Sequence, residues 1–294
     1  MASLVVVEPK KWFAPVLAPH AGPDVCTTCR GPVRAGSVHC WCCTKVCAGL
    51  AIEPDSLPPV VPIGLYRPGD PWNAVLRRYK DAPVGAARRY FVNLLKTRTE
   101  QYLSLHGACL ARETKGFDAY CVVPSSQRGR LVTAPHPLES VLGAIPAMRS
   151  FDVVRMSAGD AQAGHLRPDK AAFVPEEVAS VTDRRILVVD DSWITGARAL
   201  SAVTALDAVG ATVAGVLILG RSVDTSASEY SRSWWAVHTT PVHTAPVHTA
   251  PVHTAPVHTT PVHTTPVHTT PVPRSVPFCG RCCALECLAS RGRR

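Results

Sequence analysis

The segment with the clearest chemical potential is Asp190-Asp191-Ser192-Trp193-Ile194-Thr195-Gly196, between the apolar run Ile186–Val189 and a segment with helical periodicity. Glycine at the start of that helix lets backbone N–H groups close around an anion, and the helix N-terminus adds partial positive charge. Two adjacent carboxylates can accept hydrogen bonds from vicinal hydroxyls. A phosphate beside a diol describes a ribose 5-phosphate. In the alternative interpretation, Asp190 caps the helix and Asp191 is a solvated turn residue.

A second chemical pattern is a pair of Cys-x2-Cys turns separated by ten residues. Each turn directs two thiolates at one ion, and two turns complete the tetrahedron that Zn²⁺ prefers. The predicted ligands of this structural Zn²⁺ are Cys26, Cys29, Cys40 and Cys43. The spare cysteines Cys42 and Cys47 allow a ligand to be exchanged, and His39 is a weaker candidate.

Four more cysteines lie near the end of the chain, at positions 279, 282, 283 and 287. They can form a second metal site, supply a ligand to the first, or remain a reduced tail. We leave these alternatives open.

The elements that must position these residues follow from apolar periodicity. Apolar residues at helical spacing predict helices over Pro71–Lys80, Ala86–Leu105 and Gly196–Val209. Short β-branched or apolar runs predict strands over Ala119–Val123, Phe151–Met156, Ile186–Val189 and Thr212–Leu219. Continuous apolar runs are typical of strands buried on both faces of a parallel sheet. We therefore expect an α/β domain with an open sheet, and ligands at the carboxyl ends of its strands.

The segment Ile186–Ala197 resembles the phosphoribosyl-pyrophosphate motif of type I phosphoribosyltransferases: an apolar strand, two acids, a short loop, then Thr-Gly. Within that superfamily the chain is most similar to the ComF-like group, particularly its actinobacterial members. The supporting segments are Leu76–Lys80, Val122–Ser126, His136–Leu138, Trp234-Trp235 and Cys282-Cys283. The resemblance implies a type I phosphoribosyltransferase-like fold with a small N-terminal zinc-ribbon-like module.

The resemblance also implies roles for residues. Asp190 and Asp191 would hold the ribose hydroxyls at the catalytic centre, and the loop from Ser192 to Ala197, with the Thr195 hydroxyl, would hold the 5-phosphate. The pyrophosphate loop corresponds to the turn after the first core strand. Its candidate residues are Ser125, Ser126, Arg128 and Arg130. Mg²⁺ bridging pyrophosphate and ribose oxygens is expected, because hard cations prefer oxygen ligands.

The chain departs from the family motif at two positions. Ile194 and Arg198 stand where the family commonly has hydroxyl residues, so Arg198 either contributes charge or points to solvent. Trp193 is bulky for a ligand-binding loop and is a candidate lid. The stretch Ala158–Val174 would form the hood over the site, with contacts to base or phosphate from His165, Arg167 and Lys170.

Composition sets the wider frame. The chain has 294 residues and a formal charge of +9, which favours anionic partners. No apolar run approaches the roughly 18–20 residues that span a bilayer, and no secretory signal is apparent. We expect a cytoplasmic protein whose cysteines are metal ligands or buried thiols rather than disulfides.

The expected organisation has four parts: a Cys-rich module over 1–59, an α/β domain over 60–236, a repeat over 237–271 and a Cys-containing basic tail over 272–294. The repeat is seven copies of Val-His-Thr-(Ala or Thr)-Pro. Proline every fifth residue excludes helix and central strand, so we expect a disordered tether. Metal binding by its histidines is the weaker alternative, because neighbouring histidines lie roughly 15 Å apart in extended chain.

Two functions follow. The first is transfer of a phosphoribosyl group from phosphoribosyl pyrophosphate to an unidentified acceptor, or binding of a nucleotide 5-phosphate. The second, which the ComF-like resemblance implies, is a non-catalytic module for DNA uptake that binds single-stranded DNA or a nucleotide. The Cys-rich ribbon and the basic segments Arg77-Arg78, Lys80 and Arg88-Arg89 would then supply phosphate contacts; in the alternative interpretation these basic residues form a solvated helix face.

Overall fold

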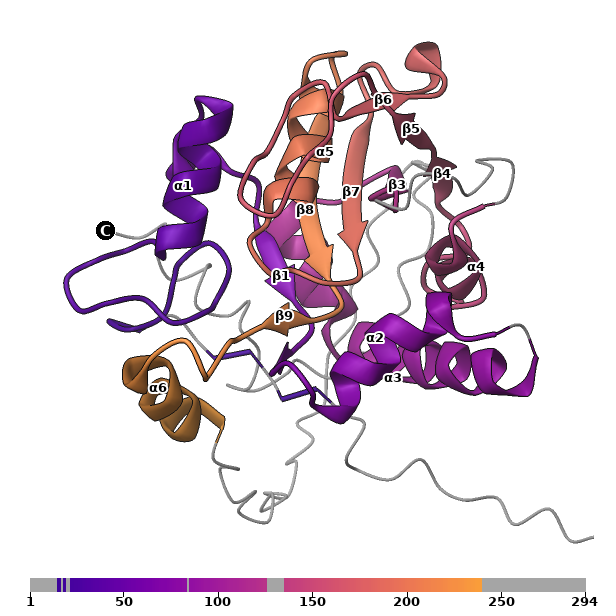
Figure 1. The fold of residues 1–294 in the computed structure, drawn as a ribbon. Helices are drawn as coiled ribbons and strands as arrows, with labels where there is room; N and C mark the ends of the chain where they lie inside the picture. The colour runs from indigo at the N-terminus through magenta and orange to yellow at the C-terminus, as the bar shows by residue number, and fades with distance from the viewer. Residues whose placement is uncertain (1–14, 17, 20–21, 84, 126–134, 240–294) are drawn as a thin grey trace, which may run out of the picture.

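The computed structural model describes residues 15–239 except 17, 20–21, 84 and 126–134. At its centre lies a five-stranded sheet in the order β1-β8-β7-β3-β4, with every neighbouring pair parallel (Figure 1). The strands are β1 (Val60–Pro62), β3 (Ala119–Val122), β4 (Asp152–Val154), β7 (Arg185–Asp190) and β8 (Thr212–Ile218). The open parallel sheet expected from the sequence is confirmed.

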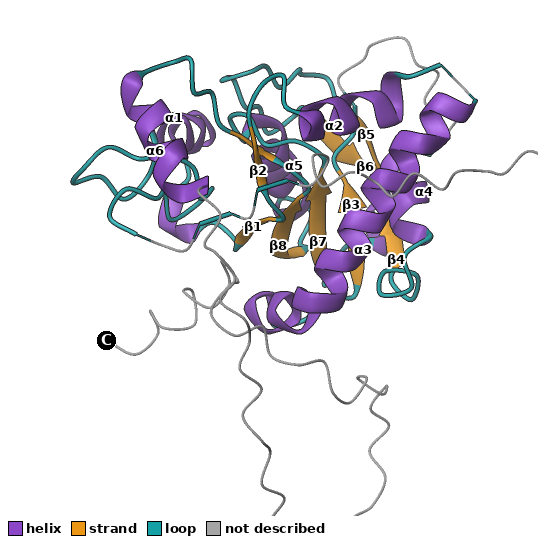
Figure 2. Cartoon of the chain, turned by 90° about the horizontal axis from the view of Figure 1, so that it is seen from below, coloured by secondary structure: helices purple, strands orange, loops and turns teal. Residues whose placement is uncertain are grey.

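Helices cover both faces of this sheet. One face packs against α1 (Trp41–Leu50) and α5 (Ala197–Asp207), and the other against α2 (Pro71–Asp81), α3 (Ala86–Thr114) and α4 (Pro137–Gly143) (Figures 1 and 2). Alternate residues of β7 serve the two cores: Ile186 and Val188 face α5, while Leu187 and Val189 face the other layer. Burial on both faces explains why the strand is continuously apolar.

Smaller elements sit at the rims of the sheet. Strands β5 (Met156–Ala158) and β6 (Phe173–Pro175) pair antiparallel, and β2 (Leu65–Tyr66) pairs parallel with β9 (Arg221–Ser222). The remaining elements are the 3-10 turns η2 (Pro54–Ser56) and η3 (Val178–Ser180) and the helix α6 (Glu229–Thr239).

The structure corrects three element predictions. The strand expected over Phe151–Met156 is interrupted at Arg155, because β4 pairs with β3 whereas β5 pairs with β6. Helix α3 extends to Thr114, nine residues further than expected, and ends where Lys115 adopts a left-handed conformation. Strand β1 was not expected, since three residues after Pro58-Pro59 give no period to recognise.

The Cys-rich segment is not isolated from the sheet. Cys26, Cys43, Val46 and Leu50 belong to the same buried core as α5 and one face of the sheet. Helix α6 also contacts this segment just before Cys26, where the Trp234 indole N–H donates to the Asp24 carbonyl at 2.7 Å. The Cys-rich segment is therefore packed against the α/β core over a continuous apolar surface.

The C-terminal predictions lie almost wholly outside the described residues. Val237, His238 and Thr239, the first three residues of the repeat, form the end of α6, and His238 Nε2 lies 2.9 Å from Asp24 Oδ2. The rest of the repeat and the tail belong to residues 240–294. Within the part of the chain that is described, no helix is both long and apolar enough to cross a membrane.

Candidate functional site

The two acids stand at the carboxyl end of β7. Asp190 is the last residue of the strand, and α5 begins six residues after Asp191, at Ala197. Gly196 caps this helix with a φ of +90°, and a Cβ atom there would lie 2.2 Å from Trp193 Cζ2. Only glycine satisfies both demands, because other residues rarely adopt this φ and have a Cβ. The loop from Ser192 to Gly196 thus folds tightly over a buried indole.

This loop offers free backbone donors. Among the described residues, the N–H groups of Ile194, Thr195 and Gly196 have no hydrogen-bond acceptor. The loop is held from below, because Trp193 N–H donates to the Gly220 carbonyl and Ser222 N–H donates to the Trp193 carbonyl, both at 2.9 Å. A run of unpaired N–H groups at a helix N-terminus is the arrangement that binds phosphate.

Asp191 is buried and already paired. Its Oδ2 accepts from the Tyr79 hydroxyl at 2.6 Å and from Lys80 Nζ at 2.7 Å. Both donors come from the last turn of α2 and tie that helix to the site. The ammonium group and the phenol hydroxyl both bond to the same carboxyl oxygen, so the Asp191 side chain is fixed in orientation.

Asp190 differs from its neighbour in having no cation in direct contact among the described residues. Burial, followed by repulsion from Asp191, raises the pKa of Asp190 from 3.8 to about 7, although Arg198 and Lys80 act in the opposite direction. Its Oδ1 accepts the Asp191 N–H at 2.9 Å. Near neutral pH this carboxyl group is poised between acid and base.

Arg198 lies at the site rather than in solvent. Its guanidinium donates to the Pro124 carbonyl after β3 and stacks 5.3 Å from the ring centre of Phe173 in β6. It therefore places positive charge beside the carboxyl end of β3. Of the two alternatives given for Arg198, charge at the site rather than exposure to solvent is the one that the structure shows.

Other loop side chains face the protein. The Ser192 hydroxyl bonds to the Tyr66 hydroxyl, and the Thr195 hydroxyl donates to the His165 carbonyl. Trp193 is 1% exposed, so the lid expectation is wrong: the indole fills the space beneath the loop. Ile194 is half exposed and Ala197 is buried. What these residues present to a ligand is chiefly backbone.

The predicted pyrophosphate loop is described only at its start. Ser125 is exposed just after β3, next to the carbonyl that Arg198 contacts. Ser126, Arg128 and Arg130 lie outside the described residues.

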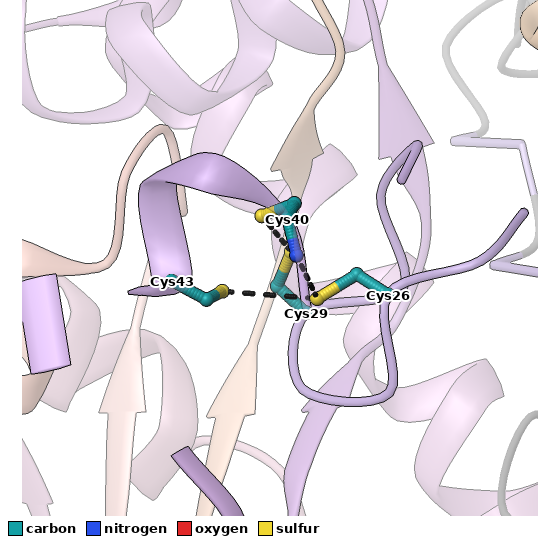
Figure 3. Close-up of side chains that lie close together, drawn as sticks. All are labelled: Cys26, Cys29, Cys40 and Cys43. Atoms are coloured by element: carbon teal, nitrogen blue, oxygen red, sulfur yellow. Dashed lines mark hydrogen bonds between the residues drawn. The ribbon is translucent and has the colours of Figure 1, made fainter. Parts of the chain in front are cut away.

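The four predicted metal ligands converge (Figure 3). Their ligand atoms all lie within 4.8 Å of one another, and each side chain is buried. The first pair sits in a tight turn closed by a 2.8 Å hydrogen bond from Cys26 N–H to the Gly31 carbonyl. The second pair opens α1, with Cys40 as its N-cap. A helix N-terminus favours thiolates, because its partial charge is positive.

The cluster fits zinc in donor type and in size. A tetrahedral ion with Zn–S bonds of about 2.3 Å requires sulfur atoms roughly 3.8 Å apart. The Cys29–Cys40 and Cys26–Cys43 sulfur pairs are separated by 3.7 Å and 3.9 Å. His39 is not a ligand here, because its Nδ1 contacts the hydroxyls of Thr27 and Thr28, each at 3.1 Å.

Sequence reasoning missed three site residues. Tyr79 and Lys80 were noted only as parts of a family segment or a basic strip, and Arg221 was not noted at all. Arg221 is 6% exposed in β9 and donates from Nη1 to the carbonyls of Trp193 and Ile194. A charged residue shortly after the apolar strand β8, separated from it by Leu219 and Gly220, was the available signal.

Comparisons with known proteins add the following. No family model matches the chain, and no curated protein matches it. An orotate phosphoribosyltransferase of Mycobacterium tuberculosis H37Rv in complex with inorganic phosphate is 16% identical, with a TM-score of 0.30 over 55% of this chain and 82% of that chain. The same enzyme in complex with Fe(III) dicitrate is 21% identical, with a TM-score of 0.25 over 45% and 76%.

A third solved structure is the phosphoribosylpyrophosphate synthetase of Mycobacterium smegmatis. It is 13% identical, with a TM-score of 0.28 over 65% of this chain and 63% of that chain. At TM-scores this low, the site residues themselves have to support any functional assignment.

Proposed function

We propose that the protein binds phosphoribosyl pyrophosphate, or a related ribose 5-phosphate, at the end of β7 and transfers the phosphoribosyl group to an acceptor. The observation behind this proposal is a single juxtaposition: unpaired N–H groups of Ile194, Thr195 and Gly196 directly follow two carboxyl groups of unlike environment. The N–H groups suit the 5-phosphate, and the carboxyl oxygens suit the ribose hydroxyls.

The two acids would divide the work. Asp191 is oriented by Tyr79 and Lys80, so its remaining oxygen can accept a hydroxyl without moving. Asp190 has no comparable hydroxyl or ammonium donor among the described residues. Its carboxyl group can therefore accept a hydrogen bond from a ribose hydroxyl, or stabilise positive charge that develops on the ribose. As the ribosyl ring becomes cationic, the ionised form of Asp190 stabilises it electrostatically.

The transfer itself breaks one bond and forms another. The bond from ribose C1 to the pyrophosphate oxygen breaks, and its electron pair leaves with pyrophosphate. A lone pair on the acceptor forms the new bond to C1, and the acceptor loses a proton. Lys80 and Arg198 supply positive charge beside the departing anion. Mg²⁺, held by ligand oxygens and by a carboxylate such as Asp190, would neutralise further charge.

The DNA-uptake role rests only on the sequence motifs that resemble ComF-like proteins. The basic strip proposed for single-stranded DNA is partly used inside the molecule. Lys80 pairs with Asp191, and Arg88 donates to the Lys80 carbonyl. Because these contacts remove cations from the surface, the phosphoribosyl assignment is the stronger one.

Turnover is tested by pyrophosphate release. The purified chain, phosphoribosyl pyrophosphate and Mg²⁺ are incubated with a panel of purine, pyrimidine and pyridine bases, and pyrophosphate is measured. We expect release with at least one base that Asp190→Asn reduces by about 10²-fold or more. The matched control is Asp152→Asn, an exposed acid at the other end of the sheet. Equal rates in both variants would rule out a catalytic role for the site.

A further inference from the structure

Arg221 lies between the two sites described above. Its Nη1 donates to the carbonyls of Trp193 at 3.3 Å and Ile194 at 3.2 Å, within the phosphate-binding loop. The other edge of the same guanidinium faces the cysteine turn: a Cβ atom on Gly31 would lie 2.8 Å from Nη2 and 3.3 Å from Nε. One side chain therefore contacts both the cysteine turn and the Ser192–Gly196 loop.

The side chain is also an isolated buried cation. Arg221 is 6% exposed, and no carboxylate forms an ion pair with it among the described residues. Burying an uncompensated guanidinium is costly. What holds it here is hydrogen bonding and packing: Nη1 donates to the carbonyls of Trp193, Ile194 and Ser222, and the cysteine turn at Gly31 encloses the other edge of the guanidinium.

Metal loading fixes the position of that turn. An ion held by Cys26, Cys29, Cys40 and Cys43 would tie the turn to the start of α1 and keep Gly31, two residues after Cys29, against the guanidinium. Without the metal, the turn loses this restraint, and Gly31 is free to move away from the guanidinium. The guanidinium then loses its fixed position, and the Trp193 and Ile194 carbonyls lose a fixed donor.

We propose that Arg221 is a positioning residue that couples metal loading of the four-cysteine cluster to the conformation of the Ser192–Gly196 loop. If the loop binds a ribose 5-phosphate, as the proposed function states, zinc and that ligand bind with positive cooperativity. The coupling is reciprocal: each ligand raises the affinity for the other by the same factor, typically about 5–150-fold. Zinc loading would thereby regulate the affinity of the Ser192–Gly196 loop for its ligand.

The first test needs no phosphate ligand. Amide hydrogen exchange is measured on the full chain, loaded with zinc and after chelation. We expect the Trp193 and Ser222 amides, which hold the loop, to exchange at least about tenfold faster after chelation. The Cys121 and Val188 amides in the central strands serve as the internal reference. Loop exchange that changes no more than the reference would overturn the coupling.

Two variants break the link while zinc is present. Arg221→Met removes the guanidinium. Gly31→Ala displaces its flexible end and keeps the charge, which covers the case in which Arg221→Met fails to fold. Matched controls are Arg185→Met, an arginine that donates to the Gly116 carbonyl at the opposite end of β7, and Gly22→Ala, where a Cβ meets nothing closer than 3.5 Å.

The reciprocal test uses ribose 5-phosphate and zinc. Chelator competition should show zinc bound at least about fivefold more tightly when ribose 5-phosphate saturates the wild-type chain and the two control variants. In Arg221→Met or Gly31→Ala the factor should fall to about one. A factor that survives in both variants would contradict the role of Arg221. If the wild-type chain binds no ribose 5-phosphate, the proposed function fails, and the hydrogen-exchange result still decides the coupling.

Discussion

Asp190 gives a prediction with a definite sign. Burial and the Asp191 charge raise its pKa from 3.8 to about 7. Between these values the folded chain binds more protons than the unfolded chain, so stability falls as pH rises through this window. The shift of about 3 units, at about 1.4 kcal/mol per unit, corresponds to about 4 kcal/mol of lost stability above pH 7.

The perturbation is Asp190→Asn, which keeps the oxygen that accepts the Asp191 N–H and removes the titration. The part of the titration window that lies above pH 5 spans about 2 pH units. Between pH 5 and pH 8.5, the unfolding free energy of the variant minus that of wild type should therefore increase by about 2–3 kcal/mol. Urea unfolding at several pH values measures it.

The control for this experiment is Asp152→Asn, because Asp152 is exposed and paired with Arg184 away from the site. Its stability difference from wild type should show no comparable gain with pH. Parallel stability curves for wild type and Asp190→Asn across pH 5–8.5 would refute the reasoning. They would mean that Asp190 is solvated and ionised like an ordinary surface acid.

Three further predictions concern the supports of the two sites. Tyr79→Phe removes a hydrogen bond to the buried carboxylate of Asp191 and should lower the unfolding free energy, measured by urea unfolding, by about 1.5–3 kcal/mol. A variant as stable as wild type would contradict this role of Tyr79. Gly196→Ala forces a Cβ against Trp193 at a φ of +90° and should destabilise by about 1–3 kcal/mol, seen as a lower Tm. Cys40→Ser should reduce zinc, measured by elemental analysis, from about one ion per chain to well below one; full retention would mean that another cysteine replaces it.

Sequence reasoning worked best where one physical rule dominates. The apolar run of β7 and the acids after it predict a strand end, because a strand buried on both faces has no polar positions. The cysteine spacing predicts the convergence of Cys26, Cys29, Cys40 and Cys43, because each turn fixes two sulfurs within a few residues. Both predictions depend on local chain only.

Long-range contacts were beyond that reasoning. The pairing of Lys80 with Asp191 joins residues 111 positions apart, and nothing in the amphipathic pattern of α2 marks which cation turns inward. Trp193 reads as a bulky intrusion in the loop, yet tertiary packing uses it as the floor beneath Gly196. Helix α3 passed its expected end because its later residues still pack on the core.

The central claim is that the acids and the loop after β7 bind the ribose 5-phosphate portion of phosphoribosyl pyrophosphate. Calorimetric titration of this ligand with Mg²⁺ into wild type and Asp190→Asn tests it most directly. Because the variant is expected to be at least as stable as wild type, lost affinity cannot be attributed to unfolding. We predict saturable 1:1 binding that weakens at least about tenfold in Asp190→Asn, as expected for a lost hydrogen bond to a charged acceptor. Equal affinity in the two proteins, or no binding by wild type, would contradict the account.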